Sequence, residues 1–196
     1  MSAAFQDVVA FALELEKLKG VLRRNKPLGQ ERYENSGEHS WQIALLALAM
    51  QPHGAETVDI GRVVQMLLVH DVPEIDAGDT MIYDTAGRAA AEAAERAGAE
   101  RIFGLLPEPQ RGRFMALWLE FTEGQTPEAR YARAIDRVMP MLQNIHNRGQ
   151  SWREHQVRVA QVVATNQPKV APVFPDAWTW LSGALDGAVA RGDLVA

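Results

Sequence analysis

The stretch LLVHDVPEIDAGDT, residues 67–80, contains a histidine and four acidic residues. Its apolar run ends in the pair His70-Asp71. Three further acids follow: Glu74, Asp76 and Asp79. An adjacent imidazole and carboxylate offer nitrogen and oxygen to one divalent ion, and borderline transition metals suit such mixed ligands. A helix C-terminus would account for His70 through its dipole but would disfavour Asp71. The pair therefore indicates a cation site.

Two residues elsewhere in the chain can complete such a site. His39 stands near the start of a predicted helix, and Asp136 lies in the otherwise apolar segment ARAIDRVMPML. A charged aspartate that is buried without a partner is strongly destabilising, so Asp136 faces water, pairs with Arg133 or Arg137, or binds a cation. Taken singly, His39 is as well explained by a capping role and Asp136 by an ion pair. Their joint role as ligands is a hypothesis.

Glu74 and Asp79 are candidate acid/base groups. Glu74 lies three residues after Asp71 and four after His70. If helical structure continues irregularly through Pro73, all three side chains can face one cavity. A carboxylate that is not itself a ligand can orient or deprotonate water in metal-assisted hydrolysis. A solvated surface glutamate and an ordinary turn aspartate are the alternatives, and the residues alone leave them open.

Helical periodicity dominates the chain, and no segment shows the sustained period-two alternation of a half-buried strand. The fold class is therefore all-α. Helices are expected over residues 3–19, 37–51, 56–71, 85–106, 108–122 and 127–149, over 152–167 with Ser151 and Glu154 as a capping box, and after Pro175. The polar segment 21–37 is expected to be a long loop, of a kind that is often functional. The candidate ligands thus come from three helices that must pack together.

Length, charge and cysteine content restrict the function classes. The 196 residues suit one domain with a full-sized core. A net charge of −5 provides no basic surface for a nucleic-acid polymer, although a small anionic substrate can bind where a metal and local arginines supply positive charge. The absence of cysteine excludes disulfides, thiolate ligands and a cysteine nucleophile.

The N-terminal segment lacks the basic start and apolar stretch of a signal peptide. The most apolar segment, residues 43–50, falls well short of the about 20 residues that a membrane span needs. We therefore expect a soluble cytoplasmic protein with no membrane partner.

The ordered segments GEHSWQIALLAL, MLLVHDVPEIDAGDT and ARAIDRV resemble the HD-domain metal-dependent phosphohydrolases, and within them the 5'-deoxynucleotidase-like branch. The resemblance covers about residues 10–145. It implies a single compact helical HD-domain fold spanning residues 1–196, with C-terminal helices in 151–192 packing on the motif-bearing core.

The resemblance also implies roles for individual residues. The implied metal ligands are His39, His70, Asp71 and Asp136. Glu74 matches the acid that activates the attacking water, and Asp79 matches the aspartate that assists at the reacting phosphate. This branch uses an arginine from the loop before the first ligand, where Arg23 and Arg24 both lie and Arg24 has the better spacing to His39. Asn25 stands where a tryptophan often follows that arginine, which leaves sugar and base selectivity open.

These observations predict a phosphohydrolase that releases phosphate from (deoxy)nucleoside 5'-monophosphates by attack of a metal-activated water. One divalent transition metal ion is expected, with Mn, Co, Fe, Zn or Ni all suitable. The resemblance further implies a homodimer. Two alternatives remain: hydrolysis of a pyrophosphorylated or cyclic nucleotide, and a non-catalytic helical metal-binding scaffold. A di-iron carboxylate bundle requires Glu-x-x-His motifs, and the sequence contains none.

Overall fold

The regular elements of the protein are helices, as expected of an all-α chain. The computed structural model describes residues 3–83 and 88–196, and within these ranges only two isolated β-bridges accompany the helices. The α-helices are α1 Ala3–Leu15, α2 Ser36–Met50, α3 Ile60–Val69, α4 Glu74–Ala77, α5 Arg88–Phe103, α6 Gln110–Glu123, α7 Pro127–His146, α8 Gln150–Glu154, α9 Val159–Val170 and α10 Pro175–Ala190. Two short 3-10 helices are η1 Glu16–Gly20 and η2 Gln51–His53.

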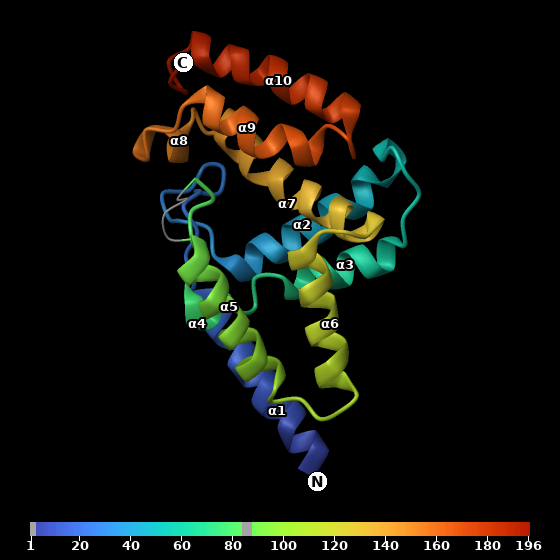
Figure 1. Ribbon diagram of the computed structural model, residues 1–196. Coiled ribbons are helices and arrows are strands. Elements are labelled where there is room, and N and C mark those ends of the chain that lie inside the picture. Colours follow the sequence, from blue (N-terminus) through green and yellow to red (C-terminus); the bar gives the residue numbers. More distant parts are fainter. Residues whose placement is uncertain (1–2, 84–87) are drawn as a thin grey trace.

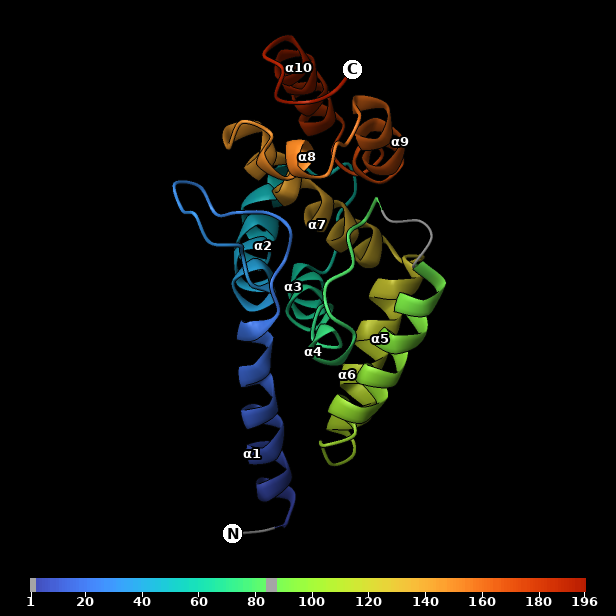
Figure 2. The ribbon, with the colours of Figure 1, turned by 90° about the vertical axis from the view of Figure 1, so that its left-hand side faces the viewer.

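Helices α3 and α7 lie at the centre of the fold. Helix α3 packs against α2, α6 and α7, and its Val63, Met66 and Leu67 are fully buried. Helix α7 contacts α9 and α10, which lie together at one end of the molecule (Figure 1). Seen from the side, α5 and α6 run next to each other, away from α9 and α10 (Figure 2). The two central helices therefore carry much of the core, and the expected ligands His70 and Asp136 lie at the end of α3 and in α7.

The start of α2 is set by local sequence. Asn35 Oδ1 accepts a hydrogen bond from the Glu38 amide at 2.9 Å, and Glu38 Oε1 accepts one from the Asn35 amide at 2.8 Å. This reciprocal capping box satisfies two backbone donors that a helix start leaves without partners. It also places His39 in the first turn, as predicted. The cap therefore defines where the His39 side chain leaves the helix.

The segment after α3 reverses direction in a few residues. His70 is the C-terminal cap of α3, a turn follows, and Glu74 begins the short helix α4. Gly78 then ends α4 with φ +73°, a left-handed conformation that favours glycine. Gly98 of α5 lies so close that a Cβ there would be 2.8 Å from the carbonyl oxygen of Pro73. Helix α5 thus packs directly on the turn that joins His70 to Glu74.

The prediction of one continuous helix over residues 152–167 is wrong. The chain forms α8 and then α9, with Gln156 between them at φ +52°. Glu154 does not complete a capping box with Ser151; its Oε2 accepts a hydrogen bond from Gln150 Nε2 at 2.8 Å. The break lets Val157 bury its side chain while its amide donates to the Trp152 carbonyl at 2.8 Å. Contacts within residues 150–157 therefore replace the predicted continuous helix.

Other helix boundaries also differ from prediction. Helix α3 begins at Ile60 rather than near residue 56, because the Asp59 side chain accepts from the Arg62 amide at 3.1 Å and acts as the N-cap. The first helix ends at Leu15 and continues as η1. The expected helix 85–106 is seen as α5, and its first residues, 85–87, lie outside the described ranges. No helix within the described ranges is both long and apolar enough to cross a membrane.

Candidate metal centre

Three predicted ligands from three parts of the chain converge on one point. His39 Nε2 on α2 lies 3.2 Å from Asp136 Oδ1 on α7. His70 Nε2, at the end of α3, lies 3.8 Å from the same oxygen. Ligand atoms of the three residues all lie within 4.8 Å of one another. His39 and Asp136 therefore do lie beside His70, as a joint role as metal ligands requires.

The chemistry of these side chains fits a divalent transition metal. The Nδ1 atom of His70 lies 2.9 Å from the Leu67 carbonyl oxygen, which leaves Nε2 directed at the centre. His70 Nε2 is buried and forms no regular hydrogen bond with any described residue. Carboxylate oxygens of Asp71 and Asp136 lie near this buried nitrogen, and a cation among these donors would compensate their charge. Two imidazole nitrogens and a carboxylate oxygen form the mixed donor set that borderline metals prefer.

Asp71 lies at the edge of this cluster. Its Oδ1 is 2.9 Å from His70 Nε2, and its Oδ2 accepts a hydrogen bond from Arg23 Nη1 at 2.7 Å. One carboxylate oxygen therefore faces the centre and the other holds an arginine. The structure brings Asp71 to the site without including it among the three tightly grouped ligands.

The two candidate arginines of the loop 21–35, between η1 and α2, take different positions. An isolated antiparallel bridge joins Leu22 to Asn35, and the Arg23 amide donates to the Glu34 carbonyl at 2.8 Å. Successive side chains of an extended segment point to opposite sides. Arg23 accordingly reaches inward and is only 14% exposed, whereas Arg24 is exposed where it lines the cavity.

Charge in the centre shifts the ionisation of its residues. Burial on its own would lower the pKa of His70, but the negative charges of Asp71 and Asp136 outweigh it and raise that pKa to about 10. Burial would likewise raise the pKa of Asp136. The hydrogen bond with His39 and the nearby His70 imidazole instead hold the pKa of Asp136 well below its ordinary value. A cationic His70 imidazole therefore balances part of the carboxylate charge in the metal-free protein.

Glu74 and Asp79 face the same cavity. Ser36 Oγ donates a hydrogen bond of 2.6 Å to Glu74 Oε2, and both residues are buried. Burial raises the pKa of Glu74 well above its ordinary value, and the nearby charge of Asp71 raises it further. Burial also raises the pKa of Asp79, against the opposing effect of Arg23. Both carboxyl groups thus hold a proton more tightly than carboxyl groups in water do.

The cavity between the helices has a volume of about 290 Å³. Its lining includes the charged residues Arg23, Glu74 and Asp79 and the aromatic residues Trp118 and Phe121 of α6. The Phe121 ring lies with its centroid 4.7 Å from that of His70. The cavity volume is near the lower end of the range for small-ligand sites. It can hold a small molecule that contacts both charged and aromatic side chains.

Glu34 is a residue of the centre that the sequence prediction missed. It is 1% exposed, and its Oε2 lies 3.3 Å from His39 Nδ1 and 3.4 Å from Arg23 Nε. Its Oε1 accepts a hydrogen bond of 2.6 Å from Gln143 Nε2 on α7. The sequence offered one indication of this role: Glu34 lies five residues before His39, in the loop that contains both candidate arginines. Polar neighbours in sequence hid the fact that this glutamate is buried.

Comparison with known proteins gives the same family. A model of the HD domain family matches residues 15–178. The protein 5'-deoxynucleotidase HDDC2 from Danio rerio is 27% identical over 136 residues, covering 67% of this chain and 66% of the relative. The HDDC2 protein from Homo sapiens is 26% identical over 136 residues. The match thus spans slightly less than two thirds of the length of these relatives.

Solved structures show the same fold. The crystal structure of a predicted metal-dependent phosphohydrolase from Magnetospirillum magnetotacticum superimposes with a TM-score of 0.93 at 39% identity, covering 99% of this chain and 97% of that one. The PH0347 protein from Pyrococcus horikoshii has a TM-score of 0.61 at 19% identity, which is a likeness of fold alone. With a family model that covers most of its length and this 39% identical relative, the chain belongs to the HD domain family.

Proposed function

We propose that this protein is a metal-dependent phosphohydrolase that releases phosphate from nucleoside 5'-monophosphates. The observation that carries the proposal is the convergence of His39, His70 and Asp136 in a cavity also lined by Glu74 and Asp79. Metal ligands beside two carboxyl groups of raised pKa suit hydrolysis of a phosphate ester. The name of the HDDC2 relatives, 5'-deoxynucleotidase, supports a nucleotide as the substrate class.

His39, His70 and Asp136 would hold the ion, with Asp71 as a fourth ligand through the oxygen that faces His70. A divalent ion in this position supplies positive charge beside a phosphate group and makes water more acidic. Mn, Co, Fe, Zn and Ni are all compatible with this donor set. The chain's own contribution is to keep four side chains from three helices in one buried place.

Glu74 is proposed as the general base. Its ionised carboxylate takes one proton from the water whose oxygen forms the new bond to phosphorus. The hydrogen bond from Ser36 fixes the direction of that carboxylate, and its raised pKa makes it a stronger base than an exposed glutamate. As the phosphorus–oxygen ester bond breaks, Asp79 in its protonated form gives a proton to the leaving nucleoside oxygen. Phosphate and nucleoside are the balanced products.

The arginines are proposed to bind phosphate. A guanidinium presents a planar set of donors that matches phosphate oxygens. Arg23 points into the centre, with Nη1 3.9 Å from Asp79 Oδ1. Arg24 is exposed to solvent and also lines the cavity. Arg23 therefore supports the reacting phosphate and Asp71 together. Arg24 contacts substrate at the outer end.

A phosphate-release assay tests the proposal. Purified protein would be incubated with deoxyribo- and ribonucleoside 5'-monophosphates and with Mn, Co, Zn or Ni, after metal analysis of protein isolated without chelator. We expect release that requires a metal and is lost in His70→Gln but kept in His146→Gln, a histidine on the protein surface. Metal binding without release from any phosphoester would favour a scaffold. Release only from pyrophosphorylated or cyclic nucleotides would favour the other hydrolase class.

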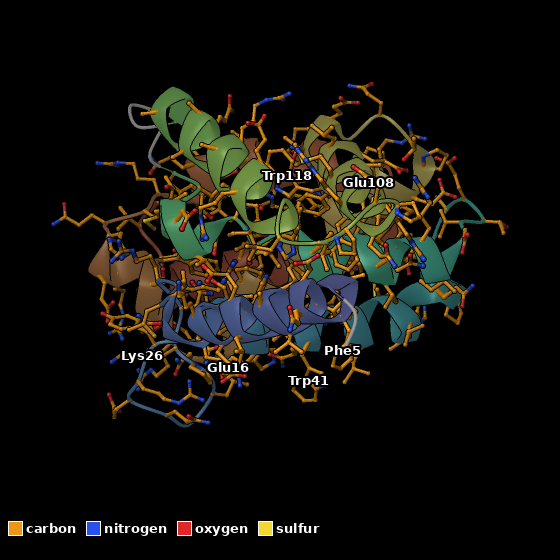
Figure 3. The ribbon with its side chains drawn as sticks, turned by 90° about the horizontal axis from the view of Figure 1, so that it is seen from below. Phe5, Glu16, Lys26, Trp41, Glu108 and Trp118 are labelled. Carbon is orange, nitrogen blue, oxygen red and sulfur yellow. The ribbon has the colours of Figure 1, made fainter. Side chains whose placement is uncertain are left out.

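We also propose that the protein forms a homodimer through an apolar face of α1 and α2. Large side chains of both helices are exposed there: Phe5 52%, Leu13 65%, Trp41 61%, Leu45 50% and Leu48 48%. Phe5 and Trp41 extend from the same side of the molecule (Figure 3). Burying such a face is a common reason for association. Light scattering should show a dimer that Trp41→Glu dissociates and Trp180→Glu on α10 does not; a monomeric parent would contradict the proposal.

A further inference from the structure

Glu34 is a buried carboxylate that interacts with donors on three different segments. Its backbone is fixed first, because its carbonyl accepts from the Arg23 amide and its amide donates to the Asn25 carbonyl, both at 2.8 Å. Its Oε1 is held by Gln143 Nε2 at 2.6 Å. These contacts leave Oε2 facing His39 Nδ1 at 3.3 Å. The carboxylate is thus immobilised before any ion is bound.

The two ring nitrogens of His39 have separate surroundings. Nε2 faces Asp136 in the candidate metal centre, and Nδ1 faces Glu34. His39 is fully buried, and neither its Nδ1 nor Glu34 Oε2 forms a regular hydrogen bond within the described residues, so each is the other's close polar neighbour at 3.3 Å. A neutral imidazole carries its proton on one nitrogen and offers the lone pair of the other. A carboxylate at Nδ1 keeps the proton there and leaves the Nε2 lone pair for a metal.

We propose that Glu34 is a positioning residue of the metal centre, which sets the tautomer and ring orientation of His39 through its Oε2. The inference rests on the proposed role of His39 as a ligand. Arg23 Nε, 3.4 Å from the same oxygen, compensates the charge of the buried carboxylate. Glu34 therefore links the arginine loop to the metal ligand. Partners of this kind typically change metal affinity by about 10–100-fold when they are replaced.

Glu34→Gln tests the proposal with little change of shape. Both oxygens of Glu34 face donors, so the amide group of glutamine would oppose a donor at one of them. Glu31→Gln is the matched control, because Glu31 lies in the same loop with a fully exposed side chain. Competition against a chelator should show Zn(II) bound about 10–100-fold more weakly by Glu34→Gln and unchanged by Glu31→Gln. Circular dichroism would verify that both variants are folded.

Nitrogen-15 NMR of the imidazoles provides a readout that a merely structural role would not change. In the zinc-loaded parent, we expect the His39 Nδ1 proton to be shifted downfield and protected from exchange. Glu34→Gln should lose this protection, and because the parent spectrum is informative by itself, the test survives a variant that fails to fold. An unprotected Nδ1 proton in the parent, or equal zinc affinity in a folded Glu34→Gln protein, would overturn the proposal.

This test is separable from that of the enzymatic function. Zinc affinity and the His39 spectrum are measured without a nucleotide. A protein that binds zinc through His39 but hydrolyses no nucleotide would sink the proposed function and still support the role of Glu34. A parent whose His39 resonances do not respond to zinc would overturn the role of Glu34 and the proposed ligand set together.

Discussion

Ser36 Oγ donates a 2.6 Å hydrogen bond to Oε2 of Glu74, so the first residue of α2 holds the carboxylate that begins α4. Both side chains are buried, and 38 positions separate them in the chain. The contact directs Glu74 into the cavity without making it a ligand of the tight cluster. In the proposed mechanism, metal binding and proton transfer therefore belong to different residues that line the same cavity.

Glu74→Gln should keep the metal and lose turnover. Glutamine has the same shape but cannot accept the proton of the attacking water, and a general base typically contributes about 10²–10⁴-fold to rate. Zinc affinity should stay close to that of the parent. Steady-state phosphate release and chelator competition measure the two effects, with Glu100→Gln, 57% exposed on α5, as control. Hydrolysis at the parent rate would remove Glu74 from the mechanism.

Asp136→Asn should abolish tight metal binding. Its Oδ1 is within 3.2 Å of one ligand imidazole and 3.8 Å of the other, so the substitution removes the shared anionic donor. The loss should exceed the about 10–100-fold expected for a residue that acts only through a ligand. Asp186→Asn, on the exposed surface of α10, is the matched control. Equal zinc affinity in the Asp136 and Asp186 variants would rule out Asp136 as a ligand.

Gly98→Ala should destabilise the protein, although alanine favours helix. The new Cβ would stand 2.8 Å from the Pro73 carbonyl oxygen, which is backbone and cannot turn aside. Overpacking costs about 1–3 kcal/mol, against about 1 kcal/mol gained in helix propensity. Gly183→Ala on α10 meets nothing within 4 Å and should be stabilising. Urea unfolding compares the two; equal stabilisation would show that α5 does not press on the turn before Glu74.

The metal-free protein should lose stability as the pH rises from about 6.5 to about 10. The pKa of His70 is raised from 6.5 to about 10 on folding, so the folded state holds this proton more tightly, and the benefit is complete only below the lower value. The pKa values of Glu74 and Asp79 are raised too, which adds loss in the same direction. Thermal unfolding in chelator, at several pH values, measures the slope.

His70→Gln should flatten that slope, and His53→Gln, at an exposed histidine, should not. The same proton must leave before His70 Nε2 can bind an ion. Metal affinity should therefore strengthen with pH across this window, by about tenfold per pH unit for each proton released. An identical slope in parent and His70→Gln protein would contradict the assignment.

Much of the protein follows from local sequence. The 3.6-residue periodicity predicts the helices, and an Asn or Ser before the second of them is a typical N-cap, the position that Asn35 takes. The spacing of His70, Asp71 and Glu74 predicts side chains that share a cavity, as the structure shows. The division into a core at about residues 10–145 and C-terminal helices over 151–192 stays a prediction. The helices, the cap and this spacing can be predicted from sequence because each depends on residues only a few positions apart.

Other features depend on segments that are remote in the chain. Asp136 meets His39 across 97 positions, and Glu34 meets Gln143 across 109. The chain breaks between α8 and α9 where a capping box and one continuous helix were predicted, and Val157 at this break is buried. Which arginine faces the centre is decided by the bridge between Leu22 and Asn35. Residue types alone identify groups able to bind a metal; only packing sets which of them meet, because contact energies act between atoms close in space.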